Sequence, residues 1–438
     1  MAIFSKEEAR KILEKALSFS TADACVVNLS GSQGGNIRYA RNSVSTAGYQ
    51  SNQNLAVTSS FGKKSGTATI DELDDESLKK VVQRAEELAK LSPENPEYME
   101  PLGPQVYDES KTFIEATANI TPEYRAEVAN SSITPAKAND VTAAGFLDDG
   151  QGSSAMMNSN GLFAYNKSTD ASFTVTMRTN DGTGSGWVTR DYNDISKFDA
   201  SEASKVAIDK AVLSREAKAI EPGKYTVILE PSAGLGLLQG LGRSIDARSA
   251  DEGRSFMSKE GGGTKLGEKI VDERVNLWSD PLNEEVPAPT WNGEGQPLKK
   301  TSWIENGVVK NLAYGRYWAK EKGVEPVPFP SNFIMGGGTA SLEDLIKGTK
   351  KGILVTRLWY IRSVDPQTLL YTGLTRDGTF YIENGKIKYP VKNFRFNESP
   401  IIMLNNLETL GKQVRVDGSL IPYMKIRDFT FTSLSDAV

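Results

Sequence analysis

Apolar residues recur at helical spacing in two stretches near the N-terminus, and alternating apolar and polar residues lie between them. Ser5 and Glu8 have the spacing of a capping box, and apolar residues on one face follow it to residue 17. Residues 74–91 begin with acids and carry a second apolar face, so they predict another helix. Short runs separated by Gly, Asn and Ser predict strands over residues 24–29, 36–40, 44–49, 55–61 and 66–70. Residues 1–100 are therefore predicted to form an N-terminal α+β unit.

Four prolines between residues 93 and 104 predict a stiff connector, and a second unit follows it. Thr121-Pro122 has the signature of a helix start. Alternation predicts strands over 141–147 and 171–178, and a helical pattern covers 201–215. Residues 105–218 are predicted to form a central α+β unit.

The remaining sequence, residues 219–438, is rich in strand patterns. Asn306-Gly307 and Asn384-Gly385 each stand between strand-like runs and predict two-residue hairpin turns. The predicted fold class is α+β, with N-terminal helix and antiparallel-sheet units followed by a strand-rich C-terminal domain.

One strand-turn-helix in this last domain has an unusual composition. Val227-Ile228-Leu229 predicts a short buried strand, and Glu230-Pro231-Ser232 predicts the break and the start of a helix. The predicted helix contains glycines at positions 234, 236, 240 and 242. Because each costs about 1 kcal/mol in a helix interior relative to alanine, the small size of these residues must serve close packing or a cleft.

Composition narrows the chemistry that this chain can carry. It has no histidine and a single cysteine, Cys25, predicted to lie in the core. Catalytic triads that use histidine, histidine-based zinc sites and four-cysteine zinc sites are therefore excluded. A carboxylate pair using Glu230, Asp246 or Glu252, a Ser-Lys dyad or an all-oxygen metal site stays open.

Charge and hydropathy favour a soluble protein without nucleic-acid partners. The 51 Lys and Arg residues against 56 Asp and Glu residues give a net charge of -5, which offers no basic surface for nucleic acid. The first ten residues, MAIFSKEEAR, contain no apolar signal core, and no later apolar run is long enough to span a membrane. We expect no membrane association and a cytoplasmic location.

Two segments carry a family resemblance: VILEPSAGLGLLQGLGRSIDARSADEGRSF at 227–256 and GILVTRLWYIRSVDPQTLLYTGLTRDGTFYIENGKIKYPVKNFRFNESP at 352–400. Both are similar to the TldD/PmbA (TldE) family, whose TldD branch carries a zinc-binding His-Glu-x-x-x-His on the same strand-turn-helix and a third, cysteine ligand near Leu-Trp-Tyr. Alignment on Pro231 places Gln239, Gly240 and Ser244 at the first histidine, the glutamate and the second histidine. Arg357 stands at the cysteine position. The older description of the family as modulators of DNA gyrase matches no feature of this sequence.

The resemblance implies a TldE-like subunit without zinc ligands and without a cofactor of its own. It would form a dimer with a zinc-bearing TldD-like subunit, or with itself, and help to hold an unfolded peptide substrate. The implied cleft-lining residues are Arg243, Tyr360, Arg362 and Asp365, each of which has a surface or interface salt bridge as its alternative role. Exposed aromatics such as Trp359, Tyr360 and Phe380 are expected at the dimer interface.

Two other functions stay open at this point. The first is a metal-independent hydrolase that uses carboxylates or a Ser-Lys pair. The second is a peptide-binding homodimer that catalyses nothing.

Overall fold

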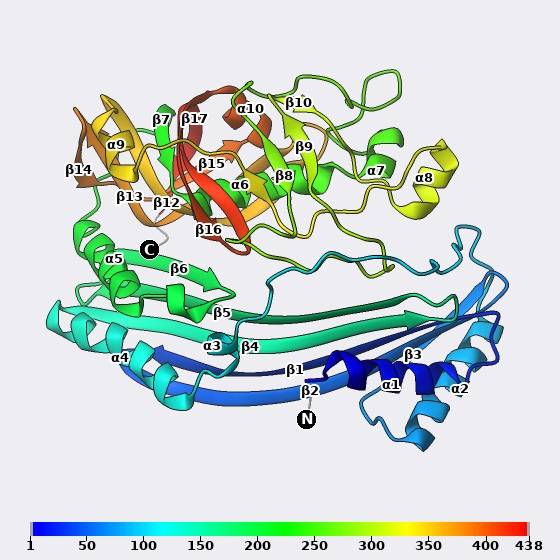
Figure 1. Ribbon diagram of the computed structural model, residues 1–438. Coiled ribbons are helices and arrows are strands. Elements are labelled where there is room, and N and C mark those ends of the chain that lie inside the picture. The colour runs from blue at the N-terminus through cyan, green and yellow to red at the C-terminus, as the bar shows by residue number, and fades with distance from the viewer. Residues whose placement is uncertain (1–2, 436–438) are drawn as a thin grey trace.

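The computed structural model describes residues 3–435, which form two bodies lying one above the other (Figure 1). The lower body is a long antiparallel sheet with helices, and the upper body is a strand-rich C-terminal domain. The predicted α+β class, with its strand-rich C-terminal part, is confirmed.

The N-terminal sheet contains six strands: β1 (Ala24–Ala40), β2 (Ser43–Phe61), β3 (Lys64–Ile70), β4 (Val141–Asn158), β5 (Phe163–Thr179) and β6 (Ser185–Tyr192). Their order is β3-β2-β1-β4-β5-β6, and all neighbours are antiparallel. Because β1 pairs with β4, the first two predicted units share one sheet.

Helices cover one face of this sheet and build two cores with it. They are α1 (Lys6–Leu17), α2 (Asp75–Leu91), α4 (Pro122–Ala138) and α5 (Ala200–Leu213), with the short α3 (Glu115–Ala118) and η1 (Ile195–Lys197) at the side. Helices α1 and α2 pack on one end of the sheet and α4 and α5 on the other. The capping box at α1 is confirmed, since the Glu8 N–H donates to Ser5 Oγ at 3.2 Å and the Ser5 N–H donates to Glu8 Oε2 at 2.8 Å. Cys25 lies in this core, as predicted.

Strand β1 runs through a stretch that was predicted to contain a break. Gly34 and Gly35 lie in its middle, where a Cβ on Gly35 would stand 2.2 Å from Cζ of Arg125. Arg125 is buried there and donates to both carboxylate oxygens of Asp149 at 2.6 and 2.7 Å. Hydrogen bonds to Asp149 raise the pKa of Arg125 further above its usual value. These glycines therefore lie within a continuous strand and do not form a turn, and the missing side chain of Gly35 lets Arg125 pack against the strand.

The C-terminal body contains the strands β7 (Lys224–Leu229), β8 (Leu277–Ser279), β9 (Thr301–Glu305), β10 (Val308–Val309), β11 (Ile334–Met335), β12 (Lys351–Asp365), β13 (Leu370–Glu383), β14 (Lys386–Pro390), β15 (Phe394–Glu398), β16 (Leu407–Val416) and β17 (Ser419–Leu434). Its helices are α6 (Pro231–Ser244), α7 (Ala247–Asp251), α8 (Arg316–Lys322), α9 (Leu342–Lys347) and α10 (Pro400–Asn405). Strand β7 pairs in parallel with β12 and antiparallel with β17. The strands β7, β12, β13, β15 and β17 thereby close on themselves as a small barrel. Both predicted Asn-Gly hairpins are confirmed, at β9-β10 and at β13-β14.

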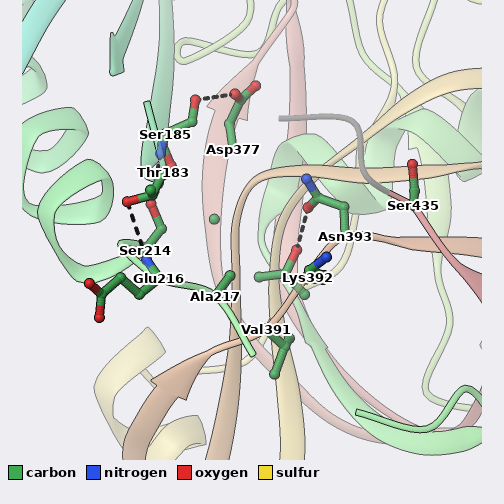
Figure 2. A pocket seen from close by; sticks show the side chains of 12 residues that line it. Thr183, Ser185, Ser214, Glu216, Ala217, Asp377, Val391, Lys392, Asn393 and Ser435 are labelled. Carbon is green, nitrogen blue, oxygen red and sulfur yellow. Dashed lines mark hydrogen bonds between the residues drawn. The ribbon is translucent and has the colours of Figure 1, made fainter. Parts of the chain in front are cut away.

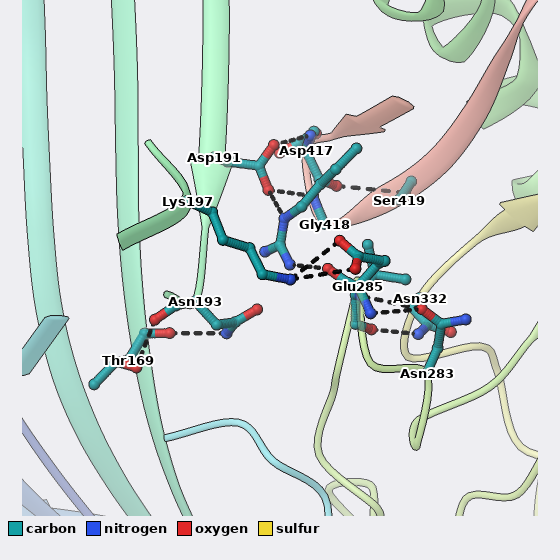
Figure 3. A network of polar contacts seen from close by, with 12 residues as sticks. Thr169, Asp191, Asn193, Lys197, Asn283, Glu285, Asn332, Asp417, Gly418 and Ser419 are labelled. Carbon is teal, nitrogen blue, oxygen red and sulfur yellow. Dashed lines mark hydrogen bonds and ion pairs between the residues drawn. The ribbon is translucent and has the colours of Figure 1, made fainter. Parts of the chain in front are cut away.

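Polar contacts tie the two bodies together beside β6 (Figure 3). Asp191 pairs with Arg415 at 2.9 Å and accepts the backbone N–H groups of Asp417 and Gly418 at 2.7 and 2.9 Å. Lys197 pairs with Glu285 at 3.2 Å. The turn between β16 and β17 is thus held against the end of the N-terminal sheet. Among residues 3–435, no helix combines the length and apolar character that crossing a membrane requires.

Candidate functional site

The strand-turn-helix predicted from residue 227 is present as β7 and α6. Val227, Ile228 and Leu229 are fully buried, with Val227 and Leu229 in the main C-terminal core and Ile228 in a smaller core on the other side of β7. Pro231 occupies the first turn of the helix. Glu230 is the N-cap residue, but its side chain makes no capping bond. It pairs with Lys210 of α5 at 2.8 Å, so the start of α6 is tied to the N-terminal body.

The glycines of α6 allow side chains from neighbouring strands to approach the helix closely. A Cβ on Gly240 would lie 2.3 Å from Oη of Tyr371, and one on Gly234 would lie 2.3 Å from Cε of Met424. A Cβ on Gly236 would lie 2.8 Å from Ile361. These three glycines serve close packing, which is one of the two roles predicted for them.

The positions aligned with the family's metal-site residues differ from one another in solvent exposure and in side-chain chemistry. Gln239 is exposed on α6, whereas Ser244 is buried and its hydroxyl donates to the Leu241 carbonyl at 2.8 Å. Gly240 lies under the ring of Tyr371. Arg357 lies on β12, where its guanidinium packs 4.3 Å from the ring centre of Trp187.

These residues do not fit a zinc ion. An amide and a hydroxyl already engaged within its own helix are poor zinc ligands, and a guanidinium is a cation without an acceptor. Arg357 also pairs with Asp377 at 3.3 Å, and burial lowers the pKa of its guanidinium below the usual value. Across residues 3–435, no three His, Cys, Asp or Glu side chains are grouped in a way that would hold a metal.

The predicted cleft-lining residues are found in two places. Arg243 is exposed on α6, while Tyr360 and Arg362 are exposed on β12, with the guanidinium of Arg362 4.5 Å from the Tyr360 ring centre. Tyr360 has a positive φ of 55°, and the register with β13 shifts between Trp359 and Arg362. A bulge of this kind redirects side chains, and here it leaves Trp359 and Tyr360 39% and 59% exposed.

Asp365 has a local role in the turn after this segment. Its carboxylate accepts the Gln367 N–H at 2.9 Å and the Thr368 hydroxyl at 2.7 Å, and the Thr368 hydroxyl contributes most to lowering its pKa. Asp365 therefore stabilises this turn. Of the four predicted cleft-lining residues, only Tyr360 and Arg362 contact each other. Phe380 was expected to be exposed, and this is wrong, because it is 1% exposed in a core with Leu354 and Ile382.

The carboxylates considered for a metal-independent hydrolase are not paired with one another. Glu230 binds Lys210, and Glu252 binds Arg248 at 3.0 Å as well as Arg254. Asp246 caps α7 by accepting the Ser249 N–H at 2.7 Å. Lys210 and Glu230 line a cavity of about 220 Å³ together with Ser232 and Thr356. The Thr356 hydroxyl donates to Glu230 at 3.3 Å, and the Ser232 hydroxyl donates to the Thr356 carbonyl at 3.0 Å, so neither hydroxyl is paired with Lys210. Burial raises the pKa of Tyr423, which also lines this cavity, to about 12.

A second cavity of about 260 Å³ lies between the two bodies and was not predicted (Figure 2). Asp377 is buried at its wall and accepts the Ser185 hydroxyl at 2.6 Å. Asp377 and Gly378 have positive φ values of 55° and 124° within β13. An Asp-Gly pair inside a strand pattern was the sequence signal for this irregularity.

Three domain models of one protein family match this chain, and together they cover most of residues 25–433. Residues 222–433 match the PmbA/TldA metallopeptidase C-terminal domain, residues 101–216 the PmbA/TldA metallopeptidase central domain, and residues 25–89 the PmbA/TldA metallopeptidase domain 1.

Individual relatives are distant in sequence but close in fold. A metalloprotease of Methanothermobacter thermautotrophicus is 25% identical over 292 residues, which span 61% of this chain and 62%, less than two thirds, of that relative. Metalloprotease PmbA of Escherichia coli O157:H7 is 22% identical over 456 residues, covering 97% of this chain and 98% of the relative. The crystal structure of TldE from Thermococcus kodakarensis has a TM-score of 0.87 at 20% identity, covering 98% of this chain and 100% of that chain. The chain belongs to the PmbA/TldD family of metallopeptidase-like proteins.

Proposed function

We propose that this protein is a cytosolic, TldE-like subunit that binds no zinc and cuts no peptide by itself. Its role is to complete the peptide-binding cavity of a zinc-bearing, TldD-like partner that acts on unfolded peptides. The observation that carries this proposal is the contact of Tyr371 with Gly240, at the position where the resemblance places the family's glutamate. A glutamate side chain has no room there unless the buried tyrosine moves.

Substrate would contact the exposed polar surfaces that remain around the degenerate site. Arg243 lies exposed on α6, which packs against the strand that carries Tyr360 and Arg362. An extended peptide added as a strand gains affinity from main-chain hydrogen bonds, so it needs few specific side chains from this subunit. This suits binding of unfolded chains of varied sequence.

The partner subunit would dock on the bulged segment of β12. Trp359 and Tyr360 form an exposed ring pair with centroids 5.3 Å apart, and Arg376 lies 4.2 Å from the Trp359 ring centre. Exposed aromatic and arginine side chains are enriched in the centres of protein interfaces. We therefore assign the partner-binding surface to the ring pair of Trp359 and Tyr360, and Arg243 and Arg362 are left as the side chains that would contact substrate.

The experiment is to recover the tagged chain from its own host and identify what co-purifies. We expect a zinc-bearing protein of the same family, and chelator-sensitive cleavage of an unstructured peptide by the pair. The variant Trp359→Ser/Tyr360→Ser should fold but lose the partner, and Val106→Ser, which changes a residue 88% exposed elsewhere, is the matched control. A chain that is recovered alone, with cleavage activity of its own, would overturn the proposal.

The two alternative functions give different results in the same assay. A metal-independent hydrolase would cleave peptide alone in the presence of chelator, and replacing the responsible carboxylate by its amide would abolish that cleavage. A non-catalytic homodimer would bind peptide but show no cleavage with any recovered partner.

A further inference from the structure

The outer edge of the N-terminal sheet is open along half of β2. Strand β2 pairs with β1 along nearly its whole length, but β3 covers its other side only from Leu55 onwards. Within residues 3–435, no strand pairs with the outer edge of residues 43–54. All of these residues are exposed except Gln53, which is half-buried and donates to the Asp71 carbonyl at 2.8 Å.

From residue 46 onwards, this open edge has none of the features by which proteins usually prevent strand pairing. Its sequence, SVSTAGYQSNQN, contains no charged residue and no proline. The register with β1 is interrupted only at Arg38/Tyr39, near the hairpin end, so residues 46–54 form a regular strand. Long, uncharged and regular edges readily add another strand, and natural proteins block them with lysine, proline or bulges when no strand is meant to bind.

The direction of the hydrogen-bonding groups follows from the β2-β3 hairpin. Phe61 and Lys64 flank a two-residue turn, which such hairpins close with a hydrogen-bonded pair. Because the pattern alternates along an antiparallel strand, the odd-numbered residues of β2 bond towards β3 and the even-numbered ones towards β1. The N–H and C=O groups of Ala47, Tyr49, Ser51 and Gln53 therefore point outwards from the open edge.

We propose that the open edge binds the same edge of a second copy of this chain, in antiparallel pairing about a two-fold axis. An antiparallel strand edge is complementary to itself under such an axis, so each copy supplies donors and acceptors to the other. The absence of charge means that two identical edges do not repel each other. Val44 and Tyr49, which are 48% and 63% exposed, lie on this strand and would be partly covered.

Pairing of this kind joins two six-stranded sheets into one continuous sheet. It uses a surface on the N-terminal body that is separate from the β12 segment assigned above to the partner subunit. The proposal therefore does not depend on the proposed function, and both surfaces can be tested in the same chain.

The test is sedimentation of the full chain carrying Ser51→Pro, with Ser51→Ala as the matched control. Proline at position 51 removes an outward N–H and places its ring in the path of the added strand, while the bonds to β1 remain. All samples also carry Trp359→Ser and Tyr360→Ser, so association through β12 does not contribute. We expect a concentration-dependent dimer when Ser51 is retained or replaced by alanine, and at least a tenfold higher dissociation constant with Ser51→Pro.

A charge exchange tests the same contact without proline. With the pairing centred on Gln50, the two-fold axis places this side chain beside its copy, so Gln50→Lys and Gln50→Glu should each be monomeric alone, and mixing the two should restore a dimer. In the dimer, hydrogen exchange by NMR should protect the amides of residues 47, 49, 51 and 53, which exchange rapidly in the monomer.

Three results would overturn the proposal. The first is a chain with Ser51 that stays monomeric at high concentration, and the second is a Ser51→Pro dimer as tight as the control. The third is protection of the odd-numbered amides only when an unstructured peptide is added, which would assign the edge to peptide and not to a second copy.

Discussion

Replacing Gly240 by alanine tests whether the degenerate site is closed by packing. The new methyl carbon would stand 2.3 Å from Oη and 2.5 Å from Cζ of Tyr371. Carbon contacts are favourable near ~3.5–4.0 Å, so the ring must move by about 1 Å or more. Tyr371 is 9% exposed and belongs to the main C-terminal core, which leaves it little room to move.

The expected effect combines two opposing terms. Alanine gains about 1 kcal/mol over glycine in a helix interior, while overpacking of a core costs roughly 1–3 kcal/mol. Gly242 provides the matched control in the same helix, because its Cβ would meet nothing closer than 3.6 Å. Since the propensity gain is similar in both variants, Gly240→Ala should be less stable than Gly242→Ala by roughly 1–3 kcal/mol.

Hydrogen exchange of α6 amides measures this difference locally, which suits a chain of several units that is not expected to unfold in one step. Gly242→Ala should slow exchange across α6 or leave it unchanged, and Gly240→Ala should speed it. Equal exchange in the two variants would mean that Tyr371 moves freely, and the argument that the site has no room for a glutamate would fail.

Other predictions concern buried charges. Asp149→Ala leaves Arg125 buried without its partner and should destabilise the N-terminal sheet by about 3–5 kcal/mol, measured by hydrogen exchange of the β1 and β4 amides. Asp209→Ala removes an exposed helical ion pair and should cost at most ~0.5 kcal/mol, and equal effects would contradict the role assigned to burial. Burial raises the pKa of Glu398 above 4.5, so its contribution to stability is complete below pH 4.5 and is lost as pH rises through the folded value. Glu398→Gln should therefore gain stability relative to wild type as pH rises above 4.5, and a difference independent of pH would refute the assignment.

Local signals in the sequence were sufficient for several elements of the fold. The capping box at Ser5, the helix over residues 74–91 and the Asn-Gly hairpins depend on neighbouring residues alone, and they formed as predicted. The strand-turn-helix of β7 and α6 was likewise predictable from neighbouring residues alone.

Features that depend on distant residues were not predictable in this way. Gly34 and Gly35 resemble a turn signal until Arg125, 90 residues later, is seen to occupy the space beside them. The pairing of β1 with β4 and the closure of the barrel by β7 and β17 likewise depend on contacts between distant segments. The Asp377 cavity exists only because β13 meets β6 across the two bodies.

The most direct test of the central claim is the zinc content of the purified chain. The protein would be dialysed against chelator, returned to zinc and measured for metal by mass spectrometry, and its cleavage of unstructured peptides assayed with and without zinc. Because an amide, a hydroxyl and a guanidinium cannot supply the three ligands that catalytic zinc requires, we predict no stoichiometric zinc and no cleavage by the chain alone. One tightly bound zinc per chain, together with cleavage that chelator abolishes, would contradict the account.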